Sequence, residues 1–413
     1  MTQATPKGLR LHIGIYGRRN AGKSSILNAI TNQQVSIVSD FAGTTTDPVE
    51  KAMELLPLGP VQFIDTAGVD DEGDLGKLRI EKTIKAFDRT DMGLIIFDKE
   101  WGDYEEEIFN ELNRRSVPVI AIANKSDIYP DTPVDKPLAL GINTIRTSAT
   151  NRDGIAAIRE SMLKIAPDDF INSPAIVGDI VGSGEIAVLV VPIDKEAPKG
   201  RLILPQVQTI RDLLDSDSYC MVVKERELKS ALKKLNFPPK LVVTDSQAFL
   251  KVVADIPQEA PLTSFSVLFS RFKGDLLTQA TGALAIENLK QNDKILVAEA
   301  CSHHPIGEDI GRVKIPRWLT QYTGCKLDFT TIQGHDFPED ITPYKLIIHC
   351  GACTFNRRNV LSRIMKCRDM GIPVTNYGLT IAYSLGIMER ALEPFPAALN
   401  AFLKEKETIS KKH

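Results

Sequence analysis

The chain has 413 residues and a formal net charge of -3, with 43% hydrophobic and 25% charged residues. This length exceeds what one ordinary hydrophobic core organises, so two or three globular domains are expected. The mildly acidic balance disfavours a protein whose main task is to grip nucleic-acid phosphates, because such surfaces are rich in Lys and Arg. We therefore do not expect a nucleic acid as a partner.

The N-terminal sequence MTQATPKGLRLHIGIYG does not have the pattern of a secretory signal peptide. No apolar stretch approaches the length needed to span a bilayer, so we expect a cytoplasmic protein without a membrane partner. Six cysteines in such a chain are expected to remain thiols. Where they cluster with histidines, metal binding is favoured over a disulfide.

Strand-like runs alternate with helical stretches along the first 168 residues. The runs are LHIGIYG, VQFID, MGLIIFD, VPVIAIAN and NTIRTSA, and several are separated by amphipathic helical patterns. This alternation predicts a parallel sheet covered by helices. The segment APDDFINSP carries turn and breaker residues and is interpreted as a linker.

Two further α/β regions are predicted, at 175–258 and 259–413. The first contains the strand-like runs IAVLVVPI, YCMVV and KLVVTD, which indicate a sheet of three or four strands. Its edges are poorly covered, so pairing with a second copy is plausible, and packing on neighbouring domains is equally compatible with the pattern. The second contains the strand-like runs KILVAEA, KLDFTTI, KLIIHCGA and IPVTNYG. The predicted fold class is therefore α/β in all three domains.

The string GRRNAGKS, from Gly17 to Ser24, matches the P-loop pattern G-x4-G-K-[ST]. It follows a predicted strand and precedes the helix-like SSILNAIT, which is the context that the pattern requires. Its glycines let backbone N–H groups face phosphate oxygens at a helix N-terminus. Lys23 is expected to reach the β- and γ-phosphates, and the Ser24 hydroxyl to bind Mg2+.

Three further strings follow predicted strands in the order found in GTPases. In DTAG, Asp65 is expected to hold Mg2+ through water, and the Gly68 N–H to sense the γ-phosphate. In NKSD, the Asp127 carboxylate can accept guanine N1–H and the exocyclic amino group, a pair that adenine does not offer. In SAT, the Ala149 N–H can meet guanine O6. The predicted GTP- and GDP-binding residues are Gly17, Asn20, Ala21, Gly22, Lys23, Ser24, Ser25, Thr45, Asp65, Gly68, Asn124, Lys125, Asp127, Ser148 and Ala149.

These motifs resemble the translation-factor-like GTPases, particularly the branch of tRNA-modification and ribosome-assembly GTPases. The string DFAGTTTD is similar to that branch's switch I, with Thr45 matching its Mg2+-binding threonine. Members with Asn at the position of Asn20 are commonly activated by potassium, which stands where other GTPases insert an arginine finger. The resemblance implies a K+ site formed by Asn20, Ser39, Phe41 and Thr44.

Val69 follows DTAG, so the chain lacks the side-chain amide that orients the attacking water in Ras-type enzymes. Hydrolysis is expected to be slow unless an ion or a partner completes the site. The residues expected to take part in catalysis are Lys23, Asn20, Thr45 and Gly68.

Two short cysteine–histidine strings follow predicted strands. They are CSHH, which begins at Cys301, and HCGAC, which runs from His349 to Cys353. Because the carboxyl ends of parallel strands open onto one crevice, the two strings can converge. A closed zinc site would use Cys301, Cys350, Cys353 and one histidine. An iron–sulfur cluster would use the three thiolates and leave one iron open. The residue types alone do not separate these metals.

The combination of a GTPase domain, a small middle domain and a C-x-H…H-C-x-x-C region resembles the FeFe-hydrogenase maturation GTPase (HydF) family over essentially the whole chain. The resemblance implies a 4Fe–4S cluster on Cys301, Cys350 and Cys353. It offers His303 and His349 as possible fourth ligands or neighbours of the cluster. Glu308 or Asp309 could supply an oxygen ligand instead.

The resemblance also implies that the chain acts as a scaffold, which receives a di-iron precursor and delivers it to apo FeFe-hydrogenase. It also implies a homodimer through the middle domain, and the radical-SAM maturases HydE and HydG as partners. The competing interpretation is an RNA-directed GTPase of the ribosome or tRNA type with a structural zinc. A redox enzyme using the cluster for electron transfer is a third class, but the sequence shows no second cofactor motif.

Overall fold

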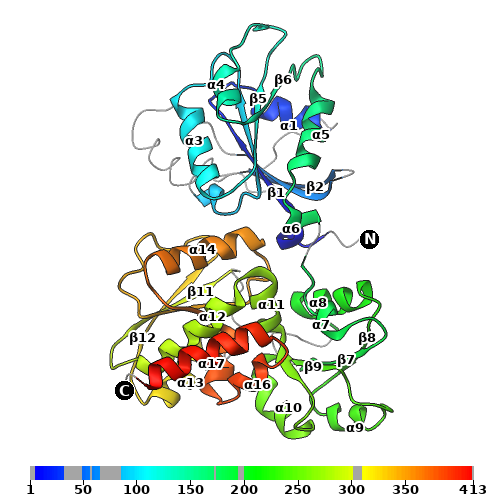
Figure 1. Cartoon of the computed structure of the whole chain (residues 1–413), viewed down its shortest axis with the longest axis vertical. Helices are drawn as coiled ribbons and strands as arrows, with labels where there is room; N and C mark the ends of the chain where they lie inside the picture. The colour runs from blue at the N-terminus through cyan, green and yellow to red at the C-terminus, as the bar shows by residue number, and fades with distance from the viewer. Residues whose placement is uncertain are drawn as a thin grey trace. The chain divides into compact units, whose positions relative to one another are not determined.

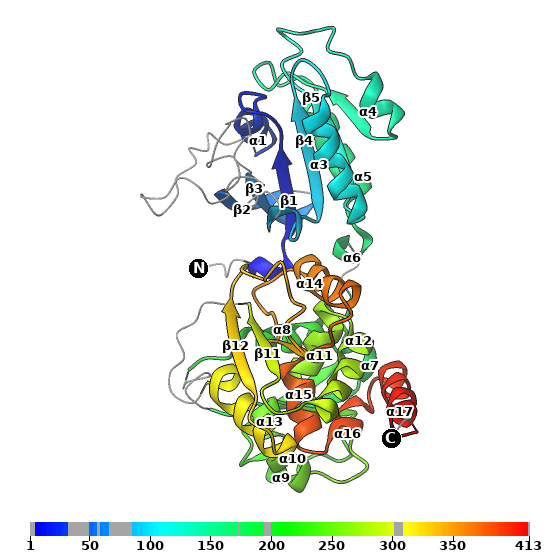
Figure 2. The ribbon, with the colours of Figure 1, turned by 90° about the vertical axis from the view of Figure 1, so that its left-hand side faces the viewer.

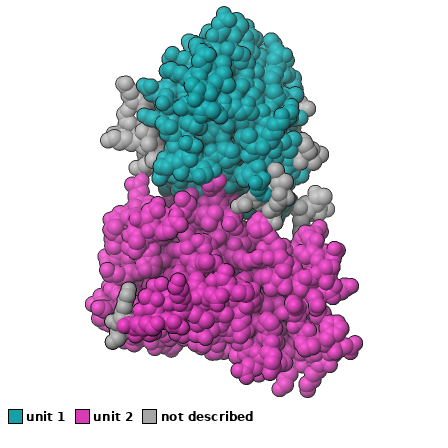
Figure 3. Space-filling view, in the orientation of Figure 1, with its two compact units in different colours: residues 1–173 teal, residues 174–413 magenta. Residues whose placement is uncertain are grey.

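The computed structural model describes residues 5–31, 49–55, 58–65, 85–171, 174–193, 200–300 and 309–411. The chain divides into two compact units, Met1–Ser173 and Pro174–His413, which Figure 3 shows in different colours. Within the described ranges, no helix combines the length and the apolar character needed to cross a membrane.

Unit 1 is built on a six-stranded sheet with the order β2-β3-β1-β4-β5-β6 (Figure 1). Only β2 runs antiparallel, against β3. Every residue of β1 and β4 is buried, as expected for central parallel strands covered on both faces. The strands are β1 (Leu11–Tyr16), β2 (Val49–Leu55), β3 (Gly59–Asp65), β4 (Met92–Phe97), β5 (Val119–Ala123) and β6 (Asn143–Arg146).

The helices of unit 1 cover both faces of its sheet. On one face, Ile26 of α1 and Ile158 of α5 pack in a single core with residues of β1, β3 and β4. On the other face, Ile108 and Leu112 of α3 pack with Tyr16 and Trp101. The helices are α1 (Lys23–Thr31), α3 (Asp103–Arg114), α4 (Asp135–Ala139), α5 (Ile155–Ile165) and α6 (Asp168–Ile171), and a 3-10 helix spans Lys7–Leu9.

Unit 2 begins with a four-stranded parallel sheet of order β10-β9-β7-β8. The sequence predicted three of these strands. The fourth, β10, pairs with β9 although it follows the predicted domain boundary at residue 258. The strands are β7 (Ile186–Val190), β8 (Tyr219–Val223), β9 (Leu241–Thr244) and β10 (Leu262–Ser264). They are accompanied by α7 (Gly178–Val181), α8 (Leu204–Asp215), α9 (Leu228–Leu232), a 3-10 turn (Ser246–Ala248) and α10 (Phe249–Asp255).

A second four-stranded sheet in unit 2 has the order β12-β11-β13-β14, with all strands parallel. Its strands are β11 (Lys294–Glu299), β12 (Asp328–Gln333), β13 (Leu346–His349) and β14 (Val374–Asn376). Because β11 and β13 are neighbours in register, Ala298 lies beside His349. The carboxyl ends of β11 and β13 therefore lie at the same edge of this sheet. In the sequence, CSHH closely follows β11, and HCGAC begins with the last residue of β13.

Helices surround the second sheet, and Figure 2 shows α17 lying outermost, over α12. They are α11 (Phe265–Lys273), α12 (Leu276–Gly282), α13 (Ile315–Thr323), α14 (Arg357–Asp369), α15 (Tyr377–Ser384), α16 (Met388–Leu392) and α17 (Pro396–Ser410). A 3-10 helix spans Ala283–Asn288 and a π-helix spans Ile310–Lys314. The predicted α/β class is confirmed in both units.

Candidate functional site

The P-loop connects β1 to α1, and its conformation requires glycine at two positions. Gly17 has a φ of +145°, and a Cβ there would lie 2.2 Å from the Ile96 carbonyl oxygen. Gly22 has a φ of +96°, and a Cβ there would lie 2.1 Å from Nδ2 of Asn124. The close approach of the loop to β4 and β5 therefore depends on the absence of side chains at these positions.

Lys23 and Asp65 lie together at the carboxyl ends of β1 and β3. The Lys23 Nζ donates to the carbonyl oxygens of Gly17 and Arg18, at 2.7 and 2.9 Å. Asp65 Oδ1 is buried and has no hydrogen-bond partner among the described residues. Burial raises the pKa of the Asp65 carboxyl, and the charge of Lys23 opposes this effect. A buried carboxylate oxygen left without a donor is suited to a cation or its bound water.

Arg18 ties the P-loop to α3, a contact that the sequence did not predict. Its Nε lies 3.1 Å from Oε1 of Glu105, whose side chain is fully buried. The other carboxylate oxygen, Oε2, accepts from the Gly102 N–H at 3.0 Å. Burial raises the pKa of Glu105, and the Gly102 hydrogen bond and Arg18 oppose that effect.

The Asn124 side chain joins two loops of the nucleotide site. Asn124 follows β5, and its Nδ2 donates to the Ala21 carbonyl oxygen at 2.9 Å. Its Oδ1 accepts from the Ala149 N–H at 3.2 Å. The amide thus holds the P-loop and the loop after β6 at a fixed spacing, which positions them for a shared ligand.

Asp127 and Ser148, which the sequence predicted as nucleotide-binding residues, lie in contact with each other. The Ser148 hydroxyl donates to Asp127 Oδ1 at 2.7 Å and accepts from the Asn151 N–H at 3.1 Å. Lys125 has a φ of +61°, and its Nζ donates to Asp98 Oδ2 at 2.8 Å. Ser148 is fully buried while Asp127 is exposed. The buried hydroxyl therefore fixes the orientation of the carboxylate, which remains accessible to a ligand.

The remaining nucleotide-site predictions fall into two groups. Asn20 is exposed with a φ of +63°, and Ser24 and Ser25 are exposed on the first turn of α1. Other predicted residues lie outside the described residues; these are Ser39, Phe41, Thr44, Thr45 and Gly68. The described part of the predicted site is therefore the P-loop, Asp65 and the two loops that contain Asn124–Asp127 and Ser148–Ala149.

Cys350 begins the loop after β13 and accepts two backbone hydrogen bonds at sulfur. The Ala300 N–H donates to Cys350 Sγ at 3.1 Å, and the Ala352 N–H at 3.4 Å. The Thr354 hydroxyl donates to the Ala300 carbonyl oxygen at 3.4 Å. N–H groups directed at sulfur favour a thiolate or a metal-bound thiolate.

A buried lysine holds the same loop from the opposite side. Lys273, the last residue of α11, is 1% exposed. Its Nζ donates to the carbonyl oxygens of Ala352, Cys353 and Phe355. Burial lowers the pKa of Lys273 to about 8, and the two cysteines oppose that shift. Burial also raises the pKa of the Cys353 thiol, which Lys273 opposes.

His349 is fully enclosed at the end of β13. Its Nδ1 donates to the Cys350 carbonyl oxygen at 3.0 Å, since that oxygen only accepts, and its Nε2 accepts from Arg363 at 3.1 Å. Burial and the Arg363 charge lower the pKa of His349 to about 3. Arg363 also stacks over Phe355, with Cζ 4.7 Å from the ring centroid. With both ring nitrogens engaged, His349 supports the loop in this conformation.

Two buried carboxylates lie near the end of β11. Glu299 Oε2 accepts from Gln333 at 3.1 Å and pairs with Arg312 at 3.3 Å, while Oε1 accepts from the Tyr377 hydroxyl at 3.4 Å. Asp309 Oδ1 caps the following π-helix by accepting from the Arg312 N–H at 2.7 Å. Asp309, a predicted alternative ligand, therefore has a helix-capping role in this structure.

Cys301, His303 and Glu308 lie outside the described residues. Within the described part, no group of three or more His, Cys, Asp or Glu side chains is arranged to hold a metal ion. The sequence analysis did not predict a role for Lys273, although its helical spacing indicated that this residue would be buried. Lys273 is spaced four and eight residues from Phe269 and Phe265, so it falls on the apolar face of its helix.

Three family models match separate ranges of the chain. Residues 12–125 match the model described as 50S ribosome-binding GTPase. Residues 176–274 match the hydrogen maturase F dimerization domain, and residues 278–394 match the hydrogen maturase F tetramerization domain. The last two models together match just over half of the chain. The chain belongs to the hydrogen maturase F family.

Curated GTPases match part of the chain. The tRNA modification GTPase MnmE of Paraburkholderia xenovorans is 35% identical over 160 residues, which are 38% of this chain and 34% of that protein. GTPase Der of Wolinella succinogenes is 39% identical over 123 residues, or 29% of this chain and 26% of that protein. The chain thus spans about a third or less of the relatives' lengths. The hydrogen maturase F chain accordingly contains a GTPase domain, as the sequence predicted.

Two solved structures are similar to part of the chain. Aquifex aeolicus Era bound to GDP and AlF4- is 26% identical, covers 38% of this chain and 57% of that chain, and has a TM-score of 0.32. The G domain of the T. maritima FeoB iron transporter is 19% identical, covers 38% of this chain and 99% of that chain, and has a TM-score of 0.30.

Proposed function

We propose that this hydrogen maturase F chain is a GTP-hydrolysing scaffold that holds a 4Fe–4S cluster and delivers a di-iron precursor to apo FeFe-hydrogenase. The observation that carries the proposal is the contact between Ala300, which directly precedes the first cysteine string, and Cys350 of the second string. Ala300, the residue before Cys301, donates its N–H to Cys350 Sγ at 3.1 Å. Because consecutive Cα atoms are about 3.8 Å apart, this contact supports convergence of Cys301, Cys350 and Cys353 on one cluster.

The donor chemistry of the loop fits such a cluster. Two N–H groups point at Cys350 Sγ, and Lys273 places a positive charge near both cysteines. Three thiolates around a cubane leave one iron for an exchangeable ligand, which suits a carrier. We propose His303 or Glu308 for that position, ahead of His349 and Asp309, whose described contacts already have structural roles.

For the nucleotide, we propose GTP with Mg2+ held by Ser24 and Thr45 directly and by Asp65 through water. The unsatisfied buried oxygen of Asp65 supports this assignment. The chain's own residues bind and orient the phosphates: Lys23 contacts the β- and γ-oxygens, and the P-loop N–H groups surround them. Asp127, held by Ser148, selects guanine.

We further propose that K+ speeds hydrolysis from a site that includes Asn20, Ser39, Phe41 and Thr44. Asn20 supports this because its positive φ presents an exposed amide on the P-loop. Replacing potassium chloride by sodium chloride at equal ionic strength is expected to slow GTP turnover. Equal rates in the two salts would remove the potassium site from the proposal.

The proposed assembly is a homodimer formed through the middle domain, with HydE, HydG and the apo-hydrogenase as partners. The exposed edge of β8 supports the dimer, since Tyr219 and Val222 on this outer strand are 64% and 43% exposed. The match of residues 278–394 to the hydrogen maturase F tetramerization domain supports further association of dimers into tetramers. The sequence analysis did not predict this further association.

The proposal is tested by separating its two activities with matched variants in the full chain, purified without oxygen. Lys23→Ala is expected to abolish GTP turnover while retaining about four irons per chain. Cys350→Ala is expected to lose the iron while retaining GTP turnover. A colourless wild-type protein containing zinc would contradict the cluster and favour an RNA-directed GTPase.

A further inference from the structure

Lys273 is an unusual buried charge. It ends α11 on the same face as Phe265 and Phe269, and it is 1% exposed. Lysine side chains are almost never fully buried without a partner, because removing an ammonium group from water is costly. Within the described residues, no carboxylate pairs with Lys273. The energetic cost of its burial is offset instead by oxygen atoms of the backbone.

All three hydrogen bonds of the ammonium group go to one short loop. Nζ donates to the carbonyl oxygens of Ala352, Cys353 and Phe355, at 3.3, 2.9 and 2.6 Å. An ammonium group has three donors, so this loop uses its full capacity. The lysine thereby fixes the direction of the backbone on both sides of Cys353.

One residue of this loop has a strained backbone conformation, which the hydrogen bonds from Lys273 help to hold in place. Ala352 has a φ of +50°, a left-handed conformation that non-glycine residues seldom adopt. Such a residue persists when its surroundings hold it in place. Lys273 bonds to the Ala352 carbonyl oxygen, and Cys350 Sγ accepts from the Ala352 N–H at 3.4 Å. The conformation of Ala352 is therefore fixed from both sides.

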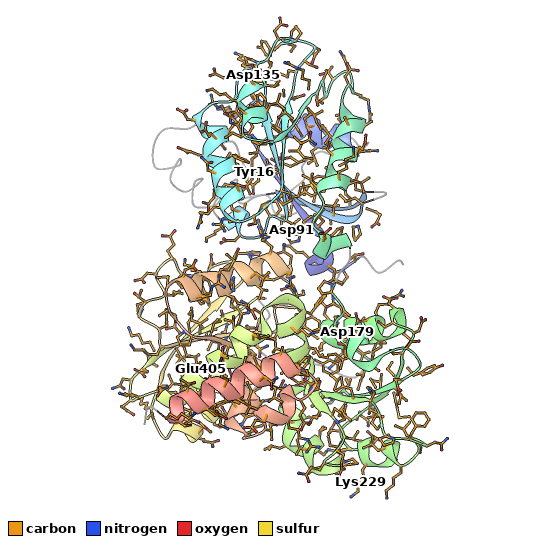
Figure 4. The ribbon with its side chains drawn as sticks, in the orientation of Figure 1. Tyr16, Asp91, Asp135, Asp179, Lys229 and Glu405 are labelled. Atoms are coloured by element: carbon orange, nitrogen blue, oxygen red, sulfur yellow. The ribbon has the colours of Figure 1, made fainter. Side chains whose placement is uncertain are left out.

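Helix α11 connects this loop to the rest of unit 2. Arg271, two residues before Lys273, pairs with Asp179 of α7, which is labelled in Figure 4. Arg357, just after the loop, donates to the Phe272 carbonyl oxygen at 2.9 Å. Residues 176–274 match the dimerization model, whereas the loop lies within 278–394, which matches the tetramerization model. Lys273 thus connects the two matched regions.

We propose that Lys273 is a positioning residue for the metal cluster, one that fixes the Cys350–Cys353 loop and compensates the negative charge of its thiolates. This inference rests on the proposed cluster. A fixed cation near the cluster stabilises the more negative, reduced state, so its removal lowers the reduction potential. The same side chain transmits any movement of α11 to the loop.

The test replaces Lys273 by Met in the full chain and compares it with Lys294→Met, which removes an exposed charge at the opposite end of β11. After anaerobic reconstitution, Lys273→Met is expected to hold several-fold less iron than Lys294→Met. The cluster that remains is expected to have a more negative midpoint potential. In the metal-free protein, amide hydrogen exchange across 350–356 is expected to accelerate, while exchange in β12 stays unchanged.

If Lys273→Met does not fold, Lys273→Gln is tested in its place, because glutamine retains two N–H donors but not the charge. The same changes in midpoint potential and in hydrogen exchange are expected for this variant. Wild-type iron content, potential and exchange in the folded Lys273 variants would overturn this inference and leave the proposed function intact. Absence of iron from the wild-type and Lys294→Met proteins would overturn both.

Discussion

Asn124 shows how one side chain can assemble a nucleotide site. Its amide bridges the Ala21 carbonyl oxygen and the Ala149 N–H, which belong to loops separated by more than a hundred residues. The bridge requires the P-loop to pass close to Asn124, which places Gly22 against its Nδ2. Gly22 is therefore needed for this close packing, and we expect it to be needed for nucleotide binding as well.

Gly22→Ala is expected to impair both properties. The new Cβ would lie 2.1 Å from Asn124 Nδ2 at a φ of +96°, so it would displace the amide and strain the backbone. We expect a loss of about 1–3 kcal/mol in the free energy of unfolding of unit 1, and at least tenfold weaker GDP binding. Urea unfolding and calorimetric titration measure the two quantities.

Gly141→Ala is the matched control for Gly22→Ala. Gly141 has a φ of +75°, but a Cβ there meets no atom within 4 Å. The control is expected to show only the backbone penalty of about 1 kcal/mol, with GDP affinity unchanged. Equal GDP affinities in the two variants would show that the Asn124 bridge does not matter for binding.

His12 gives unit 1 a specific dependence on pH. Its two ring nitrogens lie 3.2 Å from the carbonyl oxygens of Arg89 and Lys7, and its backbone N–H donates to Asp91. Burial, followed by the charge of Lys7, lowers the pKa of His12 from 6.5 to about 4. In the unfolded chain His12 therefore becomes protonated below about pH 6.5, whereas in the folded chain it stays neutral down to about pH 4.

The stability contributed by neutral His12 is present above pH 6.5 and is lost as the pH falls from 6.5 towards 4. The expected slope from this group alone is at most about 1.4 kcal/mol per pH unit. His12→Asn removes the titrating group, so its stability should fall less steeply over this range than that of the wild type. Parallel pH profiles from urea unfolding would contradict the assignment.

At the level of single residues, the sequence predicted those whose chemistry is local. The P-loop lysine, Asp127 and the Cys350–Cys353 pair could be recognised because each belongs to a short string with a fixed spacing. Lys273 and Glu105 could not be recognised in this way. Their roles depend on loops that lie 79–82 and 87 residues away in the chain, which no local pattern specifies.

At the scale of elements, strand length and burial decided which predictions succeeded. The long apolar runs became the central strands of the three sheets. The antiparallel strand β2 was missed because VEKAMEL mixes charged and apolar residues at the edge of its sheet. Strand β10 was missed because LTS contains a single apolar residue, whereas the equally short β14 lies within the strand-like run IPVTNYG. A strand without an apolar run of its own cannot be recognised before its pairing partner is known.

Strand β8 offers a test of dimer formation through a free sheet edge. The Tyr219 N–H donates to the Glu185 carbonyl oxygen on the β7 side. Because successive N–H groups of a strand point to opposite sides, those of Met221 and Val223 face β7 and that of Val222 faces the open edge. Proline at residue 222 therefore removes a donor that the monomer does not use.

Val222→Pro is expected to leave the chain folded and to convert the dimer into a monomer, as measured by sedimentation equilibrium. Met221→Pro, which removes a hydrogen bond to β7, is expected to destabilise the sheet itself and serves as the contrast. A folded Val222→Pro protein that remains a dimer at the wild-type dissociation constant would rule out pairing through this edge.

At the scale of the whole molecule, each unit has its own hydrophobic core. The cores of unit 1 pack around β1, β4 and β5, while a core of unit 2 includes Leu296, Ile347 and Cys367. The predicted nucleotide-binding residues all belong to unit 1, and the Cys350–Cys353 loop belongs to unit 2. A ligand that binds one unit is therefore expected to stabilise that unit selectively.

Calorimetry of the metal-free chain is expected to show two unfolding transitions. GDP with Mg2+ at a hundred times its dissociation constant adds about 2.7 kcal/mol to unit 1. For a unit of this size, the corresponding transition should rise by roughly 5–10 °C while the other stays in place. Lys23→Ala, which weakens phosphate binding, should reduce the shift, and Cys350→Ala should leave it unchanged. A single transition that moves as a whole with GDP would mean that the two units unfold cooperatively, and nucleotide binding would then stabilise the cysteine loop through that coupling.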